Sequence, residues 1–153
     1  MMDTDELKRR YLTGERNFRR VNLSGADLHK AQLTRADLLK GNLQNANLCR
    51  ANLTKINLYQ ANLNKADLRQ AILNESILHG ADLSSANLHR ASLIKADLCE
   101  ANLKMAHLNH TNLGAAMLRG ANLNQANLEG ADLSGAKFCQ TTMPDGTIRN
   151  DDC

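Results

Sequence analysis

The sequence predicts an all-β solenoid, a chain that winds around its own apolar core. Leucine recurs at every fifth residue from Leu23 to Leu133, 23 times in succession, and Phe18 and Phe138 extend the series by one step at each end. The residue two positions before the leucine is alanine in 18 of these 23 repeats, and the residue just before it is Asn or Asp in 17. Such fixed self-similarity indicates a repeat architecture, with one short wall and one corner per five residues.

A period of five fits neither of the common regular structures. On an α-helix, five residues advance about 500°, so successive leucines would scatter around the cylinder and leave no apolar face. On a strand, an odd period would send every second leucine to the opposite face. Only the Ala–x–Leu unit fits a strand, because its first and third side chains point the same way. The backbone must therefore turn after each unit so that the next one also faces the core.

These repeats resemble those of the pentapeptide-repeat family, whose motif is A(D/N)LXX. Residues 26–28, 46–48 and 121–123 read Ala-Asp-Leu, Ala-Asn-Leu and Ala-Asn-Leu, and similar units cover most of the chain. The resemblance implies a right-handed quadrilateral β-helix with four pentapeptides per coil. The 25 repeats from Phe18 to Phe138 would then form about six coils. The two ends of the sequence are similar to those of short cyanobacterial members.

Each corner must turn the chain between the leucine and the next alanine. A type II turn requires a positive φ at its third residue, which glycine and asparagine adopt most readily. That position holds Gly25, Gly80, Gly120, Gly130, Gly135 and Asn45. We expect leucine and alanine to point inward and the other three residues of each repeat to face solvent.

We expect one domain over residues 1–153, with a capping helix at 3–14, a β-helix at 16–140 and a C-terminal tail at 141–153. Asp3 or Thr4 can cap the helix, and Gly14 ends it. The apolar face of this helix carries Leu7, Tyr11 and Leu12. This face predicts a lid over the first coil, because the end of a solenoid needs a cover. A docking helix is the alternative interpretation.

The tail is expected to close the other end. Met143 and Ile148 stay in phase with the leucines, which predicts that the winding continues, and Pro144-Asp145-Gly146 predicts a turn.

Composition narrows the class of protein. The net charge is a mild +3 and aromatic residues make up 3% of the chain. No apolar run approaches the roughly 18 residues of a membrane span. The first twenty residues are charged and lack the apolar segment of a signal peptide. We therefore expect a cytoplasmic protein without a membrane association.

The four cysteines form no CxxC pair, so neither a zinc motif nor a redox motif is indicated. With 20 residues per coil, Cys99 and Cys139 share a wall but lie about 10 Å apart, too far for a disulfide. Cys139 and Cys153 are the only sterically open pair. Free thiols are the favoured state in a reducing compartment.

No catalytic, cofactor or metal site is expected. His107 and His110 form an HxxH string, but in this architecture the two side chains point in different outward directions, which disfavours chelation. The Asn and Asp residues before the leucines predict local hydrogen bonding rather than acid–base catalysis. A solid leucine core leaves no interior pocket. We therefore predict a protein that is not an enzyme and has no small-molecule substrate.

Two functional classes remain. The family resemblance implies that the chain could mimic B-form DNA and bind gyrase or a related topoisomerase, which requires a strongly acidic face. When the outward charges are sorted by wall, none of the four walls is net acidic, so this alternative is disfavoured. Nucleic-acid binding is likewise not favoured, because there is neither a basic excess nor an aromatic platform.

The favoured class is a rigid protein–protein interaction module with an unknown protein partner, or a homodimer. Apolar residues at outward positions identify its predicted surface: Leu39, Tyr59, Ile72, Ile77, Ile94, Cys99 and Met117. Five of them share one wall, and Ile72 and Ile94 lie on the preceding wall. We expect a near-continuous apolar row, because contiguous exposed apolar residues indicate an interface. Random drift on a tolerant surface is the alternative.

Overall fold

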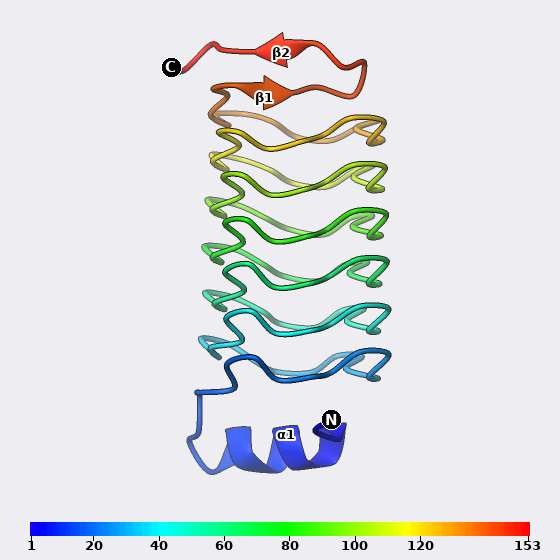
Figure 1. Ribbon diagram of the computed structural model, residues 1–153, viewed down its shortest axis with the longest axis vertical. Coiled ribbons are helices and arrows are strands. Elements are labelled where there is room, and N and C mark those ends of the chain that lie inside the picture. Colours follow the sequence, from blue (N-terminus) through cyan, green and yellow to red (C-terminus); the bar gives the residue numbers. More distant parts are fainter.

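The computed structural model describes residues 1–153 and shows a rod of stacked coils (Figure 1). Helix α1 (Thr4–Leu12) covers the N-terminal end, and strands β1 (Thr141–Thr142) and β2 (Ile148–Arg149) form an antiparallel pair at the C-terminal end. Between them, single parallel bridges join the residue just before one inward-facing leucine or phenylalanine to the equivalent residue 20 positions further along. The bridges run from Asn17 with Asp37 to Asn122 with Thr142. Twenty residues are four pentapeptides, so the chain returns to the same wall at every fourth repeat.

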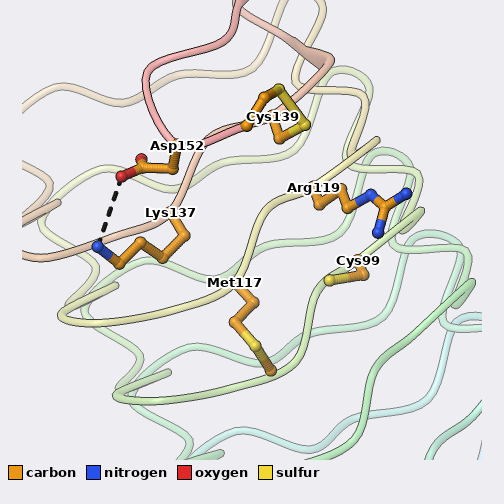
Figure 2. A pocket seen from close by; sticks show the side chains of 7 residues that line it. Cys99, Met117, Arg119, Lys137, Cys139 and Asp152 are labelled. Carbon is orange, nitrogen blue, oxygen red and sulfur yellow. Dashed lines mark hydrogen bonds and ion pairs between the residues drawn. A yellow bond between two sulfur atoms is a disulfide. The ribbon is translucent and has the colours of Figure 1, made fainter.

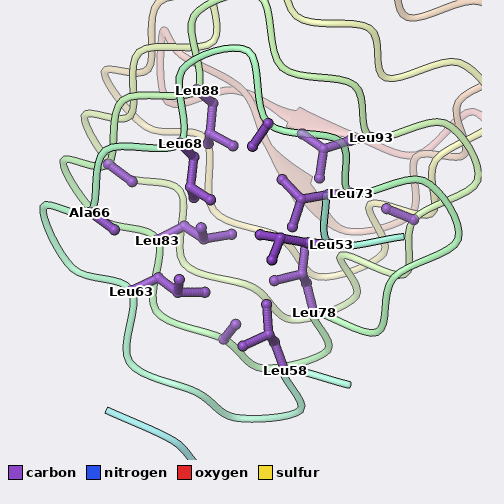
Figure 3. Close-up of a cluster of buried hydrophobic side chains, with 14 of the residues drawn as sticks. Leu53, Leu58, Leu63, Ala66, Leu68, Leu73, Leu78, Leu83, Leu88 and Leu93 are labelled. Atoms are coloured by element: carbon purple, nitrogen blue, oxygen red, sulfur yellow. The ribbon is translucent and has the colours of Figure 1, made fainter. Parts of the chain in front are cut away.

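The leucines line the axis of the rod, as Figure 3 shows for its middle coils. Every leucine of the series from Leu23 to Leu123 is at most 1% exposed. Burying one such side chain contributes about 1.5–3 kcal/mol. Leu128 and Leu133 are only partly buried and pack at the edge of this core. The predicted apolar column is thus confirmed, and its leucine side chains are least completely buried near the C-terminal end.

All five backbone N–H groups of a standard repeat have an acceptor. The N–H groups of the leucine and of the corner residue donate to the next coil, and the N–H before the leucine donates to the previous coil. The alanine N–H donates back to the leucine carbonyl and closes the corner. The N–H directly after the leucine donates to the side-chain oxygen of the preceding Asn or Asp. In residues 62–66 these five N···O distances lie between 2.7 and 3.0 Å.

The corners adopt the predicted left-handed conformation at every fifth residue from Arg20 to Gln140, with φ between 50° and 70°. Five of these positions are glycine, as expected, but 20 are not. A left-handed conformation costs a non-glycine residue about 1–2 kcal/mol. The corner hydrogen bond and the stacking of coils therefore impose a backbone conformation that these side chains alone would not choose.

Helix α1 forms the predicted lid. The Asp3 side chain accepts the N–H of Glu6 at 2.8 Å and caps the helix, and Gly14, with φ of +98°, follows its end. Leu7 is fully buried, and the Tyr11 hydroxyl donates to the carbonyl of Thr34 at 2.9 Å. The third predicted contact is wrong, since Leu12 is 83% exposed. α1 is the only helix, and nowhere does the chain hold a helix long and apolar enough to cross a membrane.

The tail does not continue the winding beyond the turn at Pro144, which corrects the prediction for Ile148. The last parallel bridge ends at Thr142, and the chain then reverses, so that Thr142 pairs with Ile148 in the β1–β2 hairpin. Ile148 is 56% exposed, whereas Met143 packs against the core. An in-phase apolar residue is thus not enough to keep the chain coiling once a turn redirects it.

Three polar residues occupy buried alanine positions, and they differ in hydrogen bonding. The hydroxyls of Thr111 and Thr141 each donate to a leucine carbonyl of the coil below at 2.7 Å. Ser76 is 1% exposed, and its Oγ has no partner. A buried hydroxyl without a partner destabilises the fold by about 1–3 kcal/mol.

We predict opposite effects for two hydroxyl deletions. Ser76→Ala should leave the free energy of unfolding unchanged or raise it by up to about 1 kcal/mol, because it removes an unsatisfied polar atom. Thr111→Val keeps the side-chain volume but deletes a hydrogen bond, and should lower stability by about 1 kcal/mol. Urea titrations followed by circular dichroism measure both. A loss in Ser76→Ala as large as that in Thr111→Val would contradict the assignment.

Candidate functional site

Five of the seven predicted surface residues lie on one wall, here called the Leu98 wall, whose outward side chains form two columns. In the first column, the residues before the leucines stack through parallel bridges: Asp37, Asn57, Ile77, Asp97, Met117 and Lys137. In the second column, the residues after the leucines follow the same 20-residue step: Leu39, Tyr59, His79, Cys99, Arg119 and Cys139.

The predicted apolar row on this wall is not continuous. In the first column Asp97 lies between Ile77 and Met117, and in the second column His79 lies between Tyr59 and Cys99. Only Leu39 and Tyr59 are stacked neighbours, because Ile77 and Met117 lie in the first column and the other three residues lie in the second. The wall is therefore a mixed surface on which apolar, charged and sulfur-bearing groups adjoin one another.

Exposure separates the seven predicted residues into two groups. Ile72, Ile77 and Met117 are 41%, 42% and 42% exposed. The other four are half-buried by their neighbours: Leu39, Tyr59, Ile94 and Cys99. All three exposed residues occupy the position before the leucine, where Asn or Asp is the rule. Each of them therefore also removes the oxygen that normally accepts the N–H two residues later.

A compact polar cluster occupies the middle of the Leu98 wall. The His79 ring stacks on Tyr59 with ring centroids 5.4 Å apart and an interplanar angle of 15°. His79 Nδ1 lies 3.8 Å from Asp97 Oδ2, and His79 Nε2 lies 3.6 Å from Glu100 Oε2. Burial, reinforced by the Asp97 carboxylate, raises the pKa of the Cys99 thiol to about 11. The thiol of Cys99 is therefore protonated at neutral pH in the absence of a bound metal ion.

A surface hollow of about 550 Å³ lies beside this cluster, towards the C-terminal end (Figure 2). Residues from the wall and from the tail line it together: Cys99, Met117, Arg119, Lys137, Cys139, Asp152 and Cys153. Sulfur atoms and the Met117 side chain supply apolar surface, and two cations border it. The returning tail thus shapes this hollow.

The tail is held in place by a set of contacts around Phe138, which we call the clasp. Cys139 and Cys153 form a disulfide. The backbone N–H of Phe138 donates to Asp152 Oδ2 at 2.9 Å, and the N–H of Asp152 donates to the Phe138 carbonyl at 2.8 Å. The Arg149 guanidinium lies 3.8 Å from the centroid of the Phe138 ring. The tail therefore closes the rod through covalent, hydrogen-bonded and cation–π contacts at once.

The disulfide corrects the expectation of four free thiols. The sequence leaves Cys139 and Cys153 as the one sterically open pair, but a reducing compartment favours their free thiols. The reversal at Pro144 carries the tail back over Phe138 and places the two Cα atoms 4.9 Å apart, within the usual range for a disulfide. Cys49 and Cys99 are free, as expected.

The histidines singled out in the sequence lie on another wall. His107 is exposed in a bridge column between Asn87 and Asn127, while His110 is at a corner with its ring edge towards His89, 5.8 Å between centroids. The residues that cluster instead are His79, Asp97 and Cys99. A signal for them existed: residues i, i+18 and i+20 must meet on one wall if a coil has 20 residues.

Comparison with known proteins identifies similar chains. The family model of pentapeptide repeats matches with eight copies, over residues 17–38, 41–80, 51–90, 76–114 and 106–143. A pentapeptide repeat protein from the cyanobacterium Cyanothece 51142 is 31% identical, over 87% of this chain and 92% of that one, with a TM-score of 0.44. No curated protein shows detectable similarity.

Two further solved structures are similar over most of the chain. HetL, a pentapeptide repeat protein involved in heterocyst differentiation regulation in the cyanobacterium Nostoc sp. strain PCC 7120, is 27% identical over 97% of this chain and 100% of its own, with a TM-score of 0.39. QnrB1, a plasmid-mediated fluoroquinolone resistance protein, is 20% identical over 81% of this chain and 69% of its own, with a TM-score of 0.39.

We predict that the clasp weakens at acid pH. The hydrogen bond from the Phe138 N–H, helped by the nearby Lys137 ammonium, holds the pKa of Asp152 below its usual value of 3.8. Because the folded-state pKa is depressed, the contribution of Asp152 is complete above pH 3.8 and is lost as the pH falls through the lower, folded-state value. The amide shift of Phe138, followed by NMR, should therefore titrate with a midpoint below 3.8.

The control for this titration is the neighbouring carboxylate. Asp151 pairs with Arg149 and does not bond to Phe138, so Asp151→Asn should leave the Phe138 titration in place. Asp152→Asn should abolish it. A midpoint at or above 3.8 in the unmodified protein would show that Asp152 does not hold the clasp as described.

Proposed function

Because this chain belongs to the pentapeptide-repeat family, we propose that it is a rigid protein–protein interaction module and not an enzyme. We take the rod to be a right-handed quadrilateral β-helix of about six coils. Its leucine core is closed to solvent through most of its length. Function must therefore reside in the outward side chains of walls whose backbone does not need to move.

One observation carries this proposal. Ile72, Ile77 and Met117 replace the Asn or Asp that 17 of 23 repeats have before the leucine, and each is more than 40% exposed. An exposed isoleucine there loses a local hydrogen bond and presents apolar surface to water. Ile72 and Ile77 are in consecutive repeats on adjoining walls, so they lie on either side of the corner between these walls. Apolar side chains exposed in this way are typical of an interface with another protein.

The proposed surface comprises the seven predicted residues, with Ile72, Ile77 and Met117 at its exposed centre. The other four residues of the proposed surface are half-buried: Leu39, Tyr59, Ile94 and Cys99. We propose another protein as its occupant, with a second copy of this chain as the alternative.

We predict that Ile72→Asn, Ile77→Asn and Met117→Asn, combined in one variant, abolish partner capture or self-association. The changes restore the side-chain oxygen that the repeat normally has, so the thermal midpoint should stay the same or rise. Pull-down from the native organism and sedimentation velocity, each compared with the unmodified protein, measure the loss.

Met105→Asn is the matched control, because Met105 is 51% exposed at a corner away from the Leu98 wall. This control should capture the same partners as the unmodified chain. If the triple variant keeps those partners and the same sedimentation behaviour, the proposed surface has no part in binding.

The alternative function is that of a DNA mimic that binds gyrase or a related topoisomerase. A DNA mimic needs a line of uncompensated negative charge. In this chain Asp37 pairs with Arg19 and Asp67 pairs with Arg69, each at 2.6 Å. These cations neutralise two of the carboxylates that a phosphate-like track would use, and the net charge is +3.

We therefore predict that DNA supercoiling by gyrase is unchanged by micromolar amounts of this protein. The measurement is an agarose-gel supercoiling assay, with a known gyrase inhibitor as the positive control. Clear, dose-dependent inhibition would instead favour the DNA-mimic function.

A further inference from the structure

Three metal-binding side chains meet on the Leu98 wall from two successive coils. His79 comes from one coil, and Asp97 and Cys99 come from the next. One nitrogen, oxygen or sulfur atom of each lies within 4.8 Å of those of the other two. All three residues are half-buried, so water competes less for these atoms than it would at an exposed site.

The repeat holds each of the three groups in place. Asp97 Oδ1 accepts the N–H of Cys99 at 3.0 Å, as Asn or Asp does throughout the rod, and this leaves Oδ2 facing His79 Nδ1. The stacked Tyr59 ring fixes the plane of the imidazole. Cys99 lies one coil from His79 in the same column, and the Gly80 N–H donates to the Cys99 carbonyl at 2.9 Å. The backbone therefore keeps the three residues next to one another on this wall, and their side chains can still rotate.

The second nitrogen of His79 also lies near a carboxylate, the type of group that often orients a metal-binding histidine. A histidine that binds a metal usually donates its other ring N–H to a carboxylate or carbonyl group, which orients the ring. Here Nδ1 faces Asp97, and Nε2 lies 3.6 Å from Glu100 Oε2. Glu100 would therefore orient the ring from outside the site without binding the cation itself.

The combination of donor atoms selects the type of cation. A thiolate, an imidazole and a carboxylate together suit Zn²⁺, whereas Mg²⁺ and Ca²⁺ prefer oxygen ligands alone. Zinc bonds of about 2.0–2.3 Å in a tetrahedral site place the ligand atoms roughly 3.5 Å apart. A contraction of about 1.3 Å from the observed limit of 4.8 Å is within reach of side-chain rotation.

We propose that His79, Asp97 and Cys99 form a zinc-binding site with an open fourth position. His79 binds through Nδ1 and Asp97 through Oδ2, and Cys99 binds as the thiolate after releasing its proton to solvent. Three protein ligands and one water molecule are a common arrangement for Zn²⁺. Cys99 also borders the hollow lined by Arg119 and Lys137 (Figure 2), so the site lies next to this hollow.

The first test measures zinc binding by the full chain, without thiol reductant so that the Cys139–Cys153 disulfide stays intact. Titration with Zn²⁺ against a chromophoric chelator should show one ion per chain. Cys99→Ser and His79→Gln should each weaken binding by more than about a hundredfold, and Glu100→Gln by about ten- to a hundredfold. Asp97→Asn should also weaken binding, while its amide oxygen preserves the hydrogen bond to the Cys99 N–H.

Matched controls come from the same repeat positions on another wall. Cys49 is the other free thiol and, like Cys99, directly follows a leucine, and His89 does so as well. Cys49→Ser and His89→Gln should bind Zn²⁺ as the unmodified chain does. Substitution with Co²⁺ adds a direct readout, because a sulfur-to-cobalt charge-transfer band should appear in the unmodified protein and be absent from Cys99→Ser.

The outcomes decide the proposal without reference to any protein partner. Stoichiometric binding that depends on His79 and Cys99 but not on Cys49 would support the site. Failure of the unmodified chain to bind one Zn²⁺, or equal affinity in Cys99→Ser, would overturn it. In that case the contacts of His79 with Asp97 and Glu100 would be only polar contacts of the wall.

Discussion

The structure depends on how a five-residue unit satisfies its five backbone N–H groups. Two donate to the next coil, one donates to the previous coil, one closes the corner, and one is accepted by the Asn or Asp side chain of the same repeat. A buried polar group without a partner is costly, so this arrangement leaves few alternatives for the backbone. It explains why 20 non-glycine residues adopt a left-handed conformation at the corners. The gain from stacking and from leucine burial exceeds the local cost.

This constraint also determines where the molecule can vary. Leucine and alanine positions face the core, and the position before the leucine supplies a hydrogen-bond acceptor, so substitutions there change stability. Ile72, Ile77 and Met117 depart from the pattern at that acceptor position and are exposed. Departures of this kind mark the surface proposed for binding, since the fold itself gains nothing from them.

The geometry of the repeat also explains which sequence-based expectations were right and which were wrong. The leucine column, the positive φ of the corners and the lid over the first coil were predictable, because each depends on residues close in sequence or on the repeat itself. The apolar row was not, because residues before and after a leucine lie in different columns. The path of the tail after Pro144 was not predictable either, because nothing in the repeat specifies a reversal. That reversal brings Cys153 to Cys139 and produces a disulfide where free thiols had been favoured.

The sequence by itself determined the period, the inward residues and the corners of this protein, because a strict five-residue repeat allows only one kind of backbone path. It also contained His79, Asp97 and Cys99, but their separation hides them from a search for closely spaced ligands. The tertiary structure decided which atoms of these residues face one another and how the tail shapes the hollow beside them. These features depend on the stacking of successive coils and on the closure of the chain end, which bring together groups that are distant in sequence.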